Sequence, residues 1–300
     1  MSAIATKDAV TAVDPIIARP PSNLWRDAAI RFSKNKLAMG ALIVVGFLVF
    51  LAVFADILAP QPNFARPIDA RKFPGEAGYI LGTDDVGRDM LKRLIHGVRT
   101  SLVVGISVQA IALVIGAALG LSAGFLGGWV DFFVMRVVEL FTAIPQLLFA
   151  LFLISIFGSG MFNVILAIAL IAWVDICRLT RAQLFSLREK EFIEAARAVG
   201  VPSWQIAWRH LLPNALTPLI IAVTLGIPTA IFTEAGLSFL GLGIDEPTAS
   251  LGKMVGVSSA YIRVYWHMGL LPTLIIALIM LSFSFVGDGL RDALDPRLRK

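Results

Sequence analysis

The sequence predicts an all-α integral membrane protein that crosses the bilayer with six helices. Hydrophobic residues make up 57% of the 300 positions and charged residues only 16%, whereas a soluble domain carries about a quarter charged residues. The mean hydropathy is +0.81. The apolar residues gather in runs of roughly twenty, the length that a helix needs to cross the hydrocarbon core. Because lipid offers the backbone no hydrogen-bond partner, each run is expected to be helical.

The apolar runs define the expected spans. The six ranges are Leu37–Leu58, Leu102–Phe125, Phe132–Phe157, Met161–Cys177, Leu216–Leu242 and Met268–Val286. In the third of them the run is cleanly apolar only from Leu140. Residues 37–300 therefore form one membrane domain, and we detect no internal repeat in it.

The segment before the first span, residues 1–36, is mixed and polar and contains Pro20-Pro21. It lacks the early apolar core of a cleavable signal peptide. We expect roughly the first twenty residues to be disordered and Trp25–Lys36 to form a short basic lead-in helix on the cytoplasmic face.

Basic residues predict which side of the membrane each loop occupies. With six spans, both termini and the segment 178–209 fall on one side and together carry sixteen Lys and Arg residues, against nine in the opposite loops. The positive-inside rule therefore predicts that both termini are cytoplasmic. This asymmetry also accounts for the net charge of +5, so no nucleic-acid partner is expected.

The loop 60–100 is predicted to contain an interfacial helix that lies on the membrane before the second span. Thr83 is a plausible N-cap, and Gly97 is a plausible end. Asp89 and Arg93 are spaced to pair at i, i+4. The helix explains why this loop is rich in positive charge on the outer side.

Three glycines in the second span, Gly116, Gly120 and Gly124, recur every four residues. This spacing lets another helix approach closely. We expect that helix to belong to the same chain, and a contact with a second subunit is the alternative.

Two acid–base pairs have helical i, i+3 spacing. Asp175 lies near the expected inner end of the fourth span, three residues before Arg178, and Arg136 and Glu139 have the same spacing. Ionisable residues at membrane depth are candidates for function by default. Here we expect an ion pair in each case.

Glu234 has no cation within four residues in the sequence. It is therefore the candidate to line the path or a gate near the outer end of the fifth span, and pairing with a partner subunit is equally open. The three histidines, His96, His210 and His267, lack metal-ligand spacing on a helix. No metal site is expected.

The cytoplasmic loop at about 186–215 predicts two short helices at an angle. Strong helix formers continue to Val199, and Gly200 can take the left-handed conformation that ends a helix. Pro202 can then open the second helix, which we expect Pro213 to terminate.

The second short helix should place Trp204, Trp208 and Leu211 on one face. A loop of this length with its own amphipathic helices is more than a connector, and it is typical of a helix that docks in a partner's groove. Ala195 and Ala196 would keep the contact close. A helix that rests on lipid headgroups is the alternative that the residues alone leave open.

The order of residues in this loop resembles the EAA loop of permease subunits in binding-protein-dependent ABC importers. The residues at the family's positions are Glu194, Ala195, Ala196, Gly200, Leu212 and Pro213. His210 replaces the usual Ile, a departure that resembles the dipeptide, oligopeptide and nickel branch. The segments 81–89, 234–243 and 287–292 are similar, in the same order, to signatures of the C-type permeases of that branch.

The resemblance implies a fold like that of type I ABC importer permeases and a place in the bacterial inner membrane. It also implies partners: a second homologous permease, two ATPase subunits that dock on the EAA loops, and an extracytoplasmic substrate-binding protein. The chain would form the path for peptides or related small solutes. Nickel chelates and glutathione-like compounds remain open as cargo.

The sequence contains no G-x-x-x-x-G-K-[ST] phosphate loop, so we expect ATP to bind the partner chains and this chain to hold no cofactor and no catalytic residue. A secondary transporter that needs no ATPase is the alternative, although the repeated halves typical of that class are missing. An intramembrane enzyme would need paired catalytic groups within the spans, which the sequence lacks.

Overall fold

The computed structural model describes residues 24–295. The predicted disorder of the first twenty residues therefore lies outside the described residues. The long helices and the short ones near them are α1 Leu24–Lys34, α2 Lys36–Val53, α3 Ala55–Leu58, α4 Met90–Leu126, α5 Gly128–Ala143, α6 Gln146–Phe157, α7 Met161–Arg188, α8 Glu191–Ala198, α9 Ser203–Ile206, the π-helix η4 Ala207–Leu211, α10 Leu212–Phe239, α11 Leu251–Ser258 and α12 Trp266–Leu294. Two 3-10 turns, η2 Pro67–Asp69 and η3 Glu76–Gly78, lie between α3 and α4.

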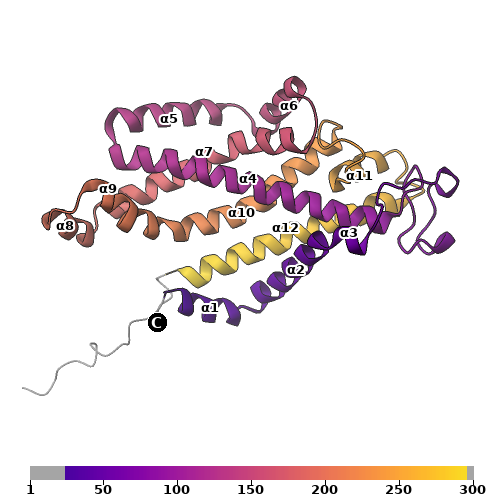
Figure 1. Cartoon of the computed structure of the whole chain (residues 1–300), viewed down its shortest axis with the longest axis horizontal. Coiled ribbons are helices and arrows are strands. Elements are labelled where there is room, and N and C mark those ends of the chain that lie inside the picture. Colours follow the sequence, from indigo (N-terminus) through magenta and orange to yellow (C-terminus); the bar gives the residue numbers. More distant parts are fainter. Residues whose placement is uncertain (1–23, 296–300) are drawn as a thin grey trace, which may run out of the picture.

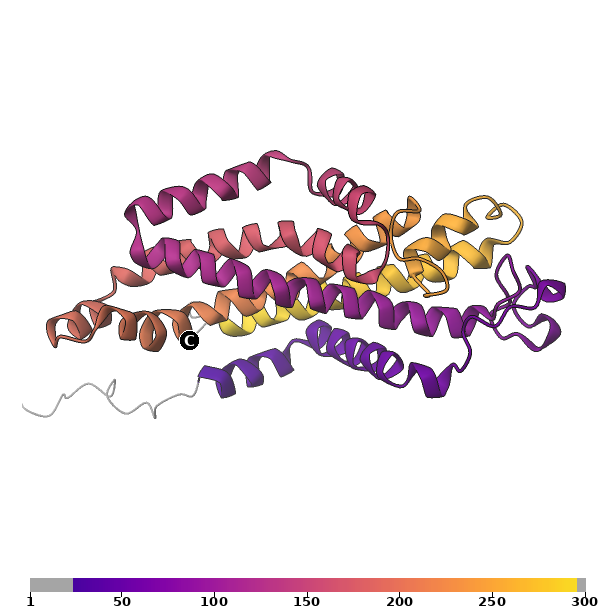
Figure 2. The same ribbon diagram turned by 45° about the horizontal axis from the view of Figure 1, so that its top comes forward.

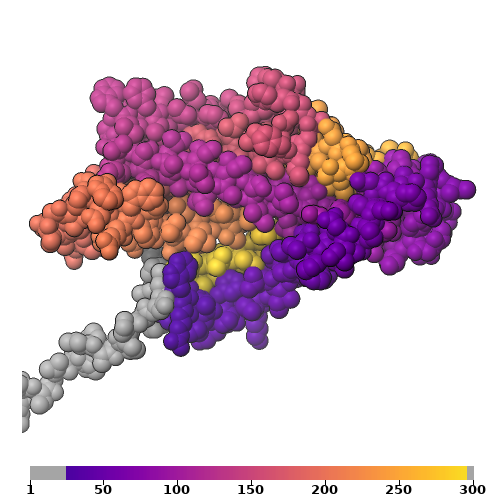
Figure 3. Space-filling model, in the orientation of Figure 1, coloured from indigo at the N-terminus to yellow at the C-terminus, as the bar shows by residue number. Residues whose placement is uncertain are grey.

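The long helices run side by side along one axis (Figure 1). One end of the molecule carries α8 and α9, and the other carries α3, α11 and the segment 59–89. The helices α5 and α6 flank α4 and α7 on one side, and α1 and α2 cover α12 on the other (Figure 2). In the space-filling view α12 is visible as a strip between α2 and α10, because it packs against both (Figure 3).

Five of the six predicted spans are present as helices or helix runs that are long and apolar enough to cross a membrane, and the third is broken. It is divided between α5 and α6, which are bent by 87° and count as a sixth crossing where the pair forms one span. The bend lies at Ile144, whose backbone is extended, directly before Pro145. A proline disfavours helical backbone in the residue before it. The expectation of one continuous helix over Phe132–Phe157 was therefore wrong.

The predicted interfacial helix is also wrong, because α4 begins at Met90 and continues without interruption through Gly97 into the second span. Asp89 is the N-cap, and its carboxylate accepts hydrogen bonds from the N–H groups of Leu91 and Lys92. A side chain at Gly97 would collide with Leu251 of α11, since a Cβ there would lie 2.6 Å from Leu251 Cδ2. Gly97 thus serves packing rather than termination.

Thr83 caps no helix. Its hydroxyl donates to the Asp69 carbonyl and accepts from the Lys72 N–H at 2.8 Å, so it fastens the loop before α4. The predicted pair between Asp89 and Arg93 does not form either, because Arg93 bonds to Glu246 instead.

The glycine stripe of α4 packs against α7 of the same chain, as predicted. A Cβ at Gly116 would lie 2.6 Å from the Trp173 carbonyl oxygen, and one at Gly120 would lie 2.6 Å from Thr180 Cβ. At Gly124 the nearest atom would be Leu184 Cβ, at 2.9 Å. The stripe is filled from within the chain, so the alternative contact with a second subunit is excluded for these residues.

Candidate functional site

The coupling segment, which we define as residues 191–213, lies at one end of the helix bundle (Figure 1). Its first helix, α8, ends as predicted with Gly200 in the left-handed conformation, at φ +84°. The Val201 N–H donates to the Ala196 carbonyl at 3.0 Å, and the Gly200 N–H donates to the Arg197 carbonyl at 2.9 Å. These two bonds form a Schellman motif, which satisfies carbonyls at the helix end.

A small apolar cluster fixes the coupling segment to the bundle. Ile193 of α8, Ile206 of α9 and Leu211 of η4 are buried together with Leu184 near the end of α7. Any displacement of the coupling segment would therefore pull on α7 and on α10, which follows η4 directly.

The side of α8 opposite this cluster is free within the chain. Glu194, Ala195 and Gly200 are exposed, whereas Ala196 is half-buried and packs against the cluster. The two alanines at the family's positions thus differ: Ala195 is available to a partner, and Ala196 keeps α8 close to its own chain.

Two expectations for the second short helix were wrong. Pro213 does not end it, because α9, η4 and α10 form one continuous 37-residue run. The Leu212 N–H bonds back to the Ala207 carbonyl in a wide π-turn directly before the proline. In a regular α-helix the proline ring would collide with the carbonyl four residues earlier, and the wider turn relieves that crowding.

The second wrong expectation is the shared face of Trp204, Trp208 and Leu211. Leu211 is 1% exposed in the apolar cluster, whereas the two tryptophans are 66% and 61% exposed. They give the coupling segment an apolar surface of its own.

Glu234 of α10 is fully buried and bonds within its own chain. Ser238 donates to its Oε1 at 2.8 Å and Ser250, the N-cap of α11, donates to the same oxygen at 2.9 Å. These bonds tie α10 to the loop before α11. The expected role of Glu234 in the path or gate stays a prediction.

A cavity of about 440 Å³ lies beside the break between α5 and α6. Four elements line it: α4, the break, the middle of α7 and α10. Its polar side chains are Gln109, Thr142, Gln146, Asp175 and Thr229. This cavity was not predicted from the sequence, although Pro145 inside an apolar run indicates a break.

Asp175 lines this cavity instead of pairing with Arg178. Among residues 24–295 no ion pair involves Asp175, and Arg178 donates to the Thr142 hydroxyl at 2.8 Å. The expected pair was therefore wrong. The other predicted pair, between Arg136 and Glu139, is present.

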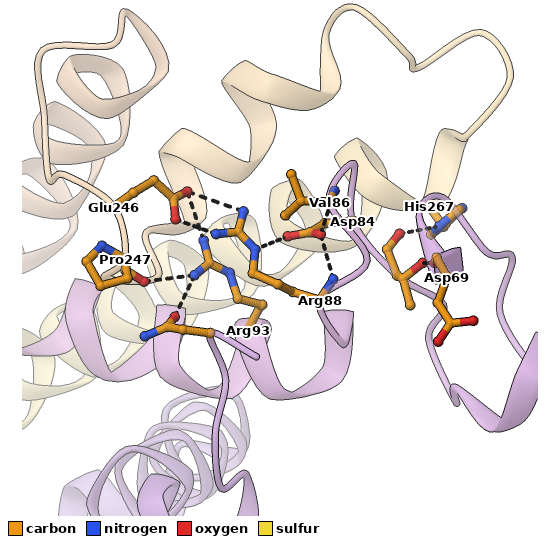
Figure 4. A network of polar contacts seen from close by, with 10 residues as sticks. Asp69, Asp84, Val86, Arg88, Arg93, Glu246, Pro247 and His267 are labelled. Carbon is orange, nitrogen blue, oxygen red and sulfur yellow. Dashed lines mark hydrogen bonds and ion pairs between the residues drawn. The ribbon is translucent and has the colours of Figure 1, made fainter. Parts of the chain in front are cut away.

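A charged network fastens the loops at the opposite end of the bundle (Figure 4). Arg93, only 2% exposed, bonds to Glu246, to the Pro247 carbonyl and to Asn63. Arg88 bridges the same Glu246 to Asp84 (Figure 4).

Next to this network, burial raises the pKa of Asp85, and the neighbouring Asp84 raises it further. The network joins the segment before α4 to the loop before α11.

The described residues offer little to a metal ion. Within residues 24–295 no three His, Cys, Asp or Glu side chains gather closely enough to hold one. His96 contacts the Ala59 carbonyl at 3.0 Å and His267 contacts the Thr83 carbonyl at 3.4 Å. Both rings therefore bind backbone of their own chain.

The chain is similar over most of its length to known membrane transport proteins. A family model described as "Binding-protein-dependent transport system inner membrane component" matches residues 116–300, and one described as "N-terminal TM domain of oligopeptide transport permease C" matches residues 23–74. The dipeptide transport system permease protein DppC of Alkalihalophilus pseudofirmus is 39% identical over 98% of this chain and 93% of the relative. The oligopeptide transport system permease protein OppC of Bacillus subtilis is 36% identical over 95% and 93%.

Two further similarities complete the comparison. The glutathione transport system permease protein GsiD of Pectobacterium atrosepticum is 36% identical over 92% of this chain and 92% of the relative. Among solved structures, an inward-facing conformation of the MetNI methionine ABC transporter covers 69% of this chain and 98% of its own, with a TM-score of 0.57 and 24% identity. That structure shares the fold.

Proposed function

The chain belongs to the family of binding-protein-dependent transport system inner membrane components and is a permease subunit of an ATP-driven importer, and from this premise we propose that its cargo is peptides. Relatives named as dipeptide and oligopeptide permeases, 36 to 39% identical over nearly the whole chain, support this cargo. Membership of this family excludes the alternative function, a secondary transporter that needs no ATPase.

The structure of the coupling segment supports our proposal that partner subunits hydrolyse the ATP while this chain forms the path. It exposes Glu194, Ala195 and Gly200 and anchors to α7 through buried apolar residues. One side of the coupling segment is exposed to a partner and the other is packed against α7. This arrangement suits a docking element that passes a partner's movement to the spans. We assign it to two ATPase subunits that bind and hydrolyse the ATP, one on this chain and one on a second, homologous permease.

The remaining partners follow from the same family. An extracytoplasmic binding protein would deliver the cargo to the end that carries α3 and α11. The coupling segment, α1 and the end of α12 lie toward the other end (Figure 1), and we place that end, with both termini, in the cytoplasm. This arrangement agrees with the charge asymmetry of the loops.

Glutathione is the second candidate cargo, because the relative named for glutathione transport matches the chain at 36% identity. Nickel chelates remain an alternative from the resemblance alone.

Reconstitution tests the proposal. The complete complex in proteoliposomes, with the loaded binding protein outside and ATP with the ATPase subunits, should accumulate a labelled dipeptide only when ATP is present. Glutathione and a nickel chelate serve as competing cargoes. ATP-independent accumulation, or accumulation of either competitor in place of every peptide tested, would overturn the cargo assignment.

A further inference from the structure

The cavity beside the break between α5 and α6 is bordered by α4, α7 and α10, which are all long and apolar enough to cross a membrane. Asp175 stands 14 residues after the start of α7 at Met161 and 13 before its end at Arg188, which at about 1.5 Å per residue puts it about 20 Å from either end. Broken helices at membrane depth are tolerated where the freed backbone lines a water-filled cavity. Ile144 and Pro145, at which the helix breaks, both line the cavity.

The carboxyl group of Asp175 enters this cavity without a cation of its own. Its side chain is exposed, and its neighbour Arg178, one turn further along α7, is engaged by Thr142. An ionisable residue in an apolar helix bundle is a candidate for a functional role, and this carboxylate is free to bind a cation that enters the cavity.

Gln109 gives an independent indication of a ligand. Its side chain is 5% exposed and lines the cavity, and within residues 24–295 no hydrogen bond engages its amide. The amide lies against Gly226 of α10, where a Cβ would be only 2.5 Å from Gln109 Cδ. The amide atoms remain reachable from the cavity, so they are free to bond to a ligand that enters it.

We propose that this cavity is a cargo-binding station in the path, in which Asp175 binds the ammonium group of a peptide and Gln109 bonds to its first peptide group. A carboxylate and an amide that line the same cavity can bind the protonated amine and the adjacent peptide group at the start of a peptide. The volume of about 440 Å³ lies within the usual range for small-ligand sites. The inference rests on the proposed peptide cargo and adds a site for it inside the permease.

Transport by variants of the complete complex tests the site. Asp175→Asn keeps the shape and removes the charge, and we expect dipeptide uptake to fall about tenfold while ATP hydrolysis stimulated by loaded binding protein stays within about twofold, since a tenfold loss corresponds to about 1.4 kcal/mol. Asp175→Glu should restore most of the uptake. Gln109→Leu should lower it about threefold.

Glu139→Gln is the matched control, because it removes one carboxylate from α5 outside the cavity lining, and its uptake should equal wild type. Equal uptake by Asp175→Asn and wild type would overturn the site. A parallel loss of uptake and ATP hydrolysis would also overturn it, because that result indicates a structural role. Failure of the wild-type complex to import any peptide would instead overturn the proposed function.

The contact between Asp175 and the ammonium group of the peptide can be tested in the absence of the binding protein. Saturation-transfer NMR on the complex in nanodiscs, with a dipeptide or its N-acetylated form at millimolar concentration, should give a signal for the free amine alone. Asp175→Asn should abolish that signal. Equal signals from both peptides, or none from either, would contradict the assignment.

Discussion

Gly200 holds the backbone conformation on which the end of α8 depends. A Cβ at this position would meet nothing within 4 Å, so a larger side chain is disfavoured by the positive φ and not by crowding. Gly200→Val should cost about 1–2 kcal/mol locally and weaken the ATP hydrolysis that loaded binding protein stimulates in the complex. Gly200→Asn, which tolerates the left-handed region, is the control. Equal loss in both variants would show that the conformation is irrelevant.

Glu246 neutralises two arginines, of which Arg93 is almost fully buried. Glu246→Gln should lower the free energy of unfolding by roughly 1–3 kcal/mol, because it leaves a buried charge with weaker partners. The exposed pair of Glu139 with Arg136 is the comparison, and Glu139→Gln should cost less than about 1 kcal/mol. Thermal unfolding of the purified chain measures both. A similar shift in the two variants would contradict the importance of the network.

Single residues were predictable where the cause is local. The left-handed Gly200 follows from glycine chemistry next to a run of helix formers. The partners of Arg178 and Arg93 could not be predicted, because each depends on where a distant element lies. Arg178 finds Thr142 on α5 and Arg93 finds Glu246 in the loop before α11, and helical spacing within one segment cannot reveal such contacts.

At the scale of elements, α4 and α7 share the most extensive helix–helix contact among the described residues. Gly120→Ala would place a Cβ 2.6 Å from Thr180 Cβ and should lower stability by about 1–3 kcal/mol through overpacking. Gly46→Ala on α2 is the matched control, because nothing lies within 4 Å of that position and alanine favours a helix by up to about 1 kcal/mol over glycine. In detergent, the unfolding temperature should fall for Gly120→Ala and rise for Gly46→Ala. Equal shifts in the two variants would contradict close packing between α4 and α7.

The elements themselves were largely predictable, but their ends were not. Apolar length finds each span because the bilayer requires it. It cannot show that α4 starts at Met90 or that α7 continues to Arg188, because those extensions are amphipathic and are stabilised by other parts of the chain. The break between α5 and α6 could have been predicted, because Pro145 disfavours helical backbone at Ile144.

At the scale of the whole molecule, the orientation in the membrane is open to a direct test. Ser259, directly after α11, and Ala198, the last residue of α8, are both exposed, and α11 and α8 lie toward opposite ends of the bundle (Figure 1). In a Cys177→Ala background, Ser259→Cys should react with a membrane-impermeant maleimide on intact cells, and Ala198→Cys should react only after permeabilisation. The reverse pattern would invert the orientation.

The central claim is that the coupling segment transmits the action of an ATPase subunit to the spans. Crosslinking tests it most directly, and Ala195 is the better position because it is exposed while Ala196 is half-buried. In the assembled complex, Ala195→Cys should form a disulfide with a cysteine placed in the groove of the ATPase subunit, and the crosslink should stop dipeptide uptake until it is reduced. Ser259→Cys should form none. A complex that transports peptide with ATP while no position of the coupling segment crosslinks to the ATPase subunit would contradict the account.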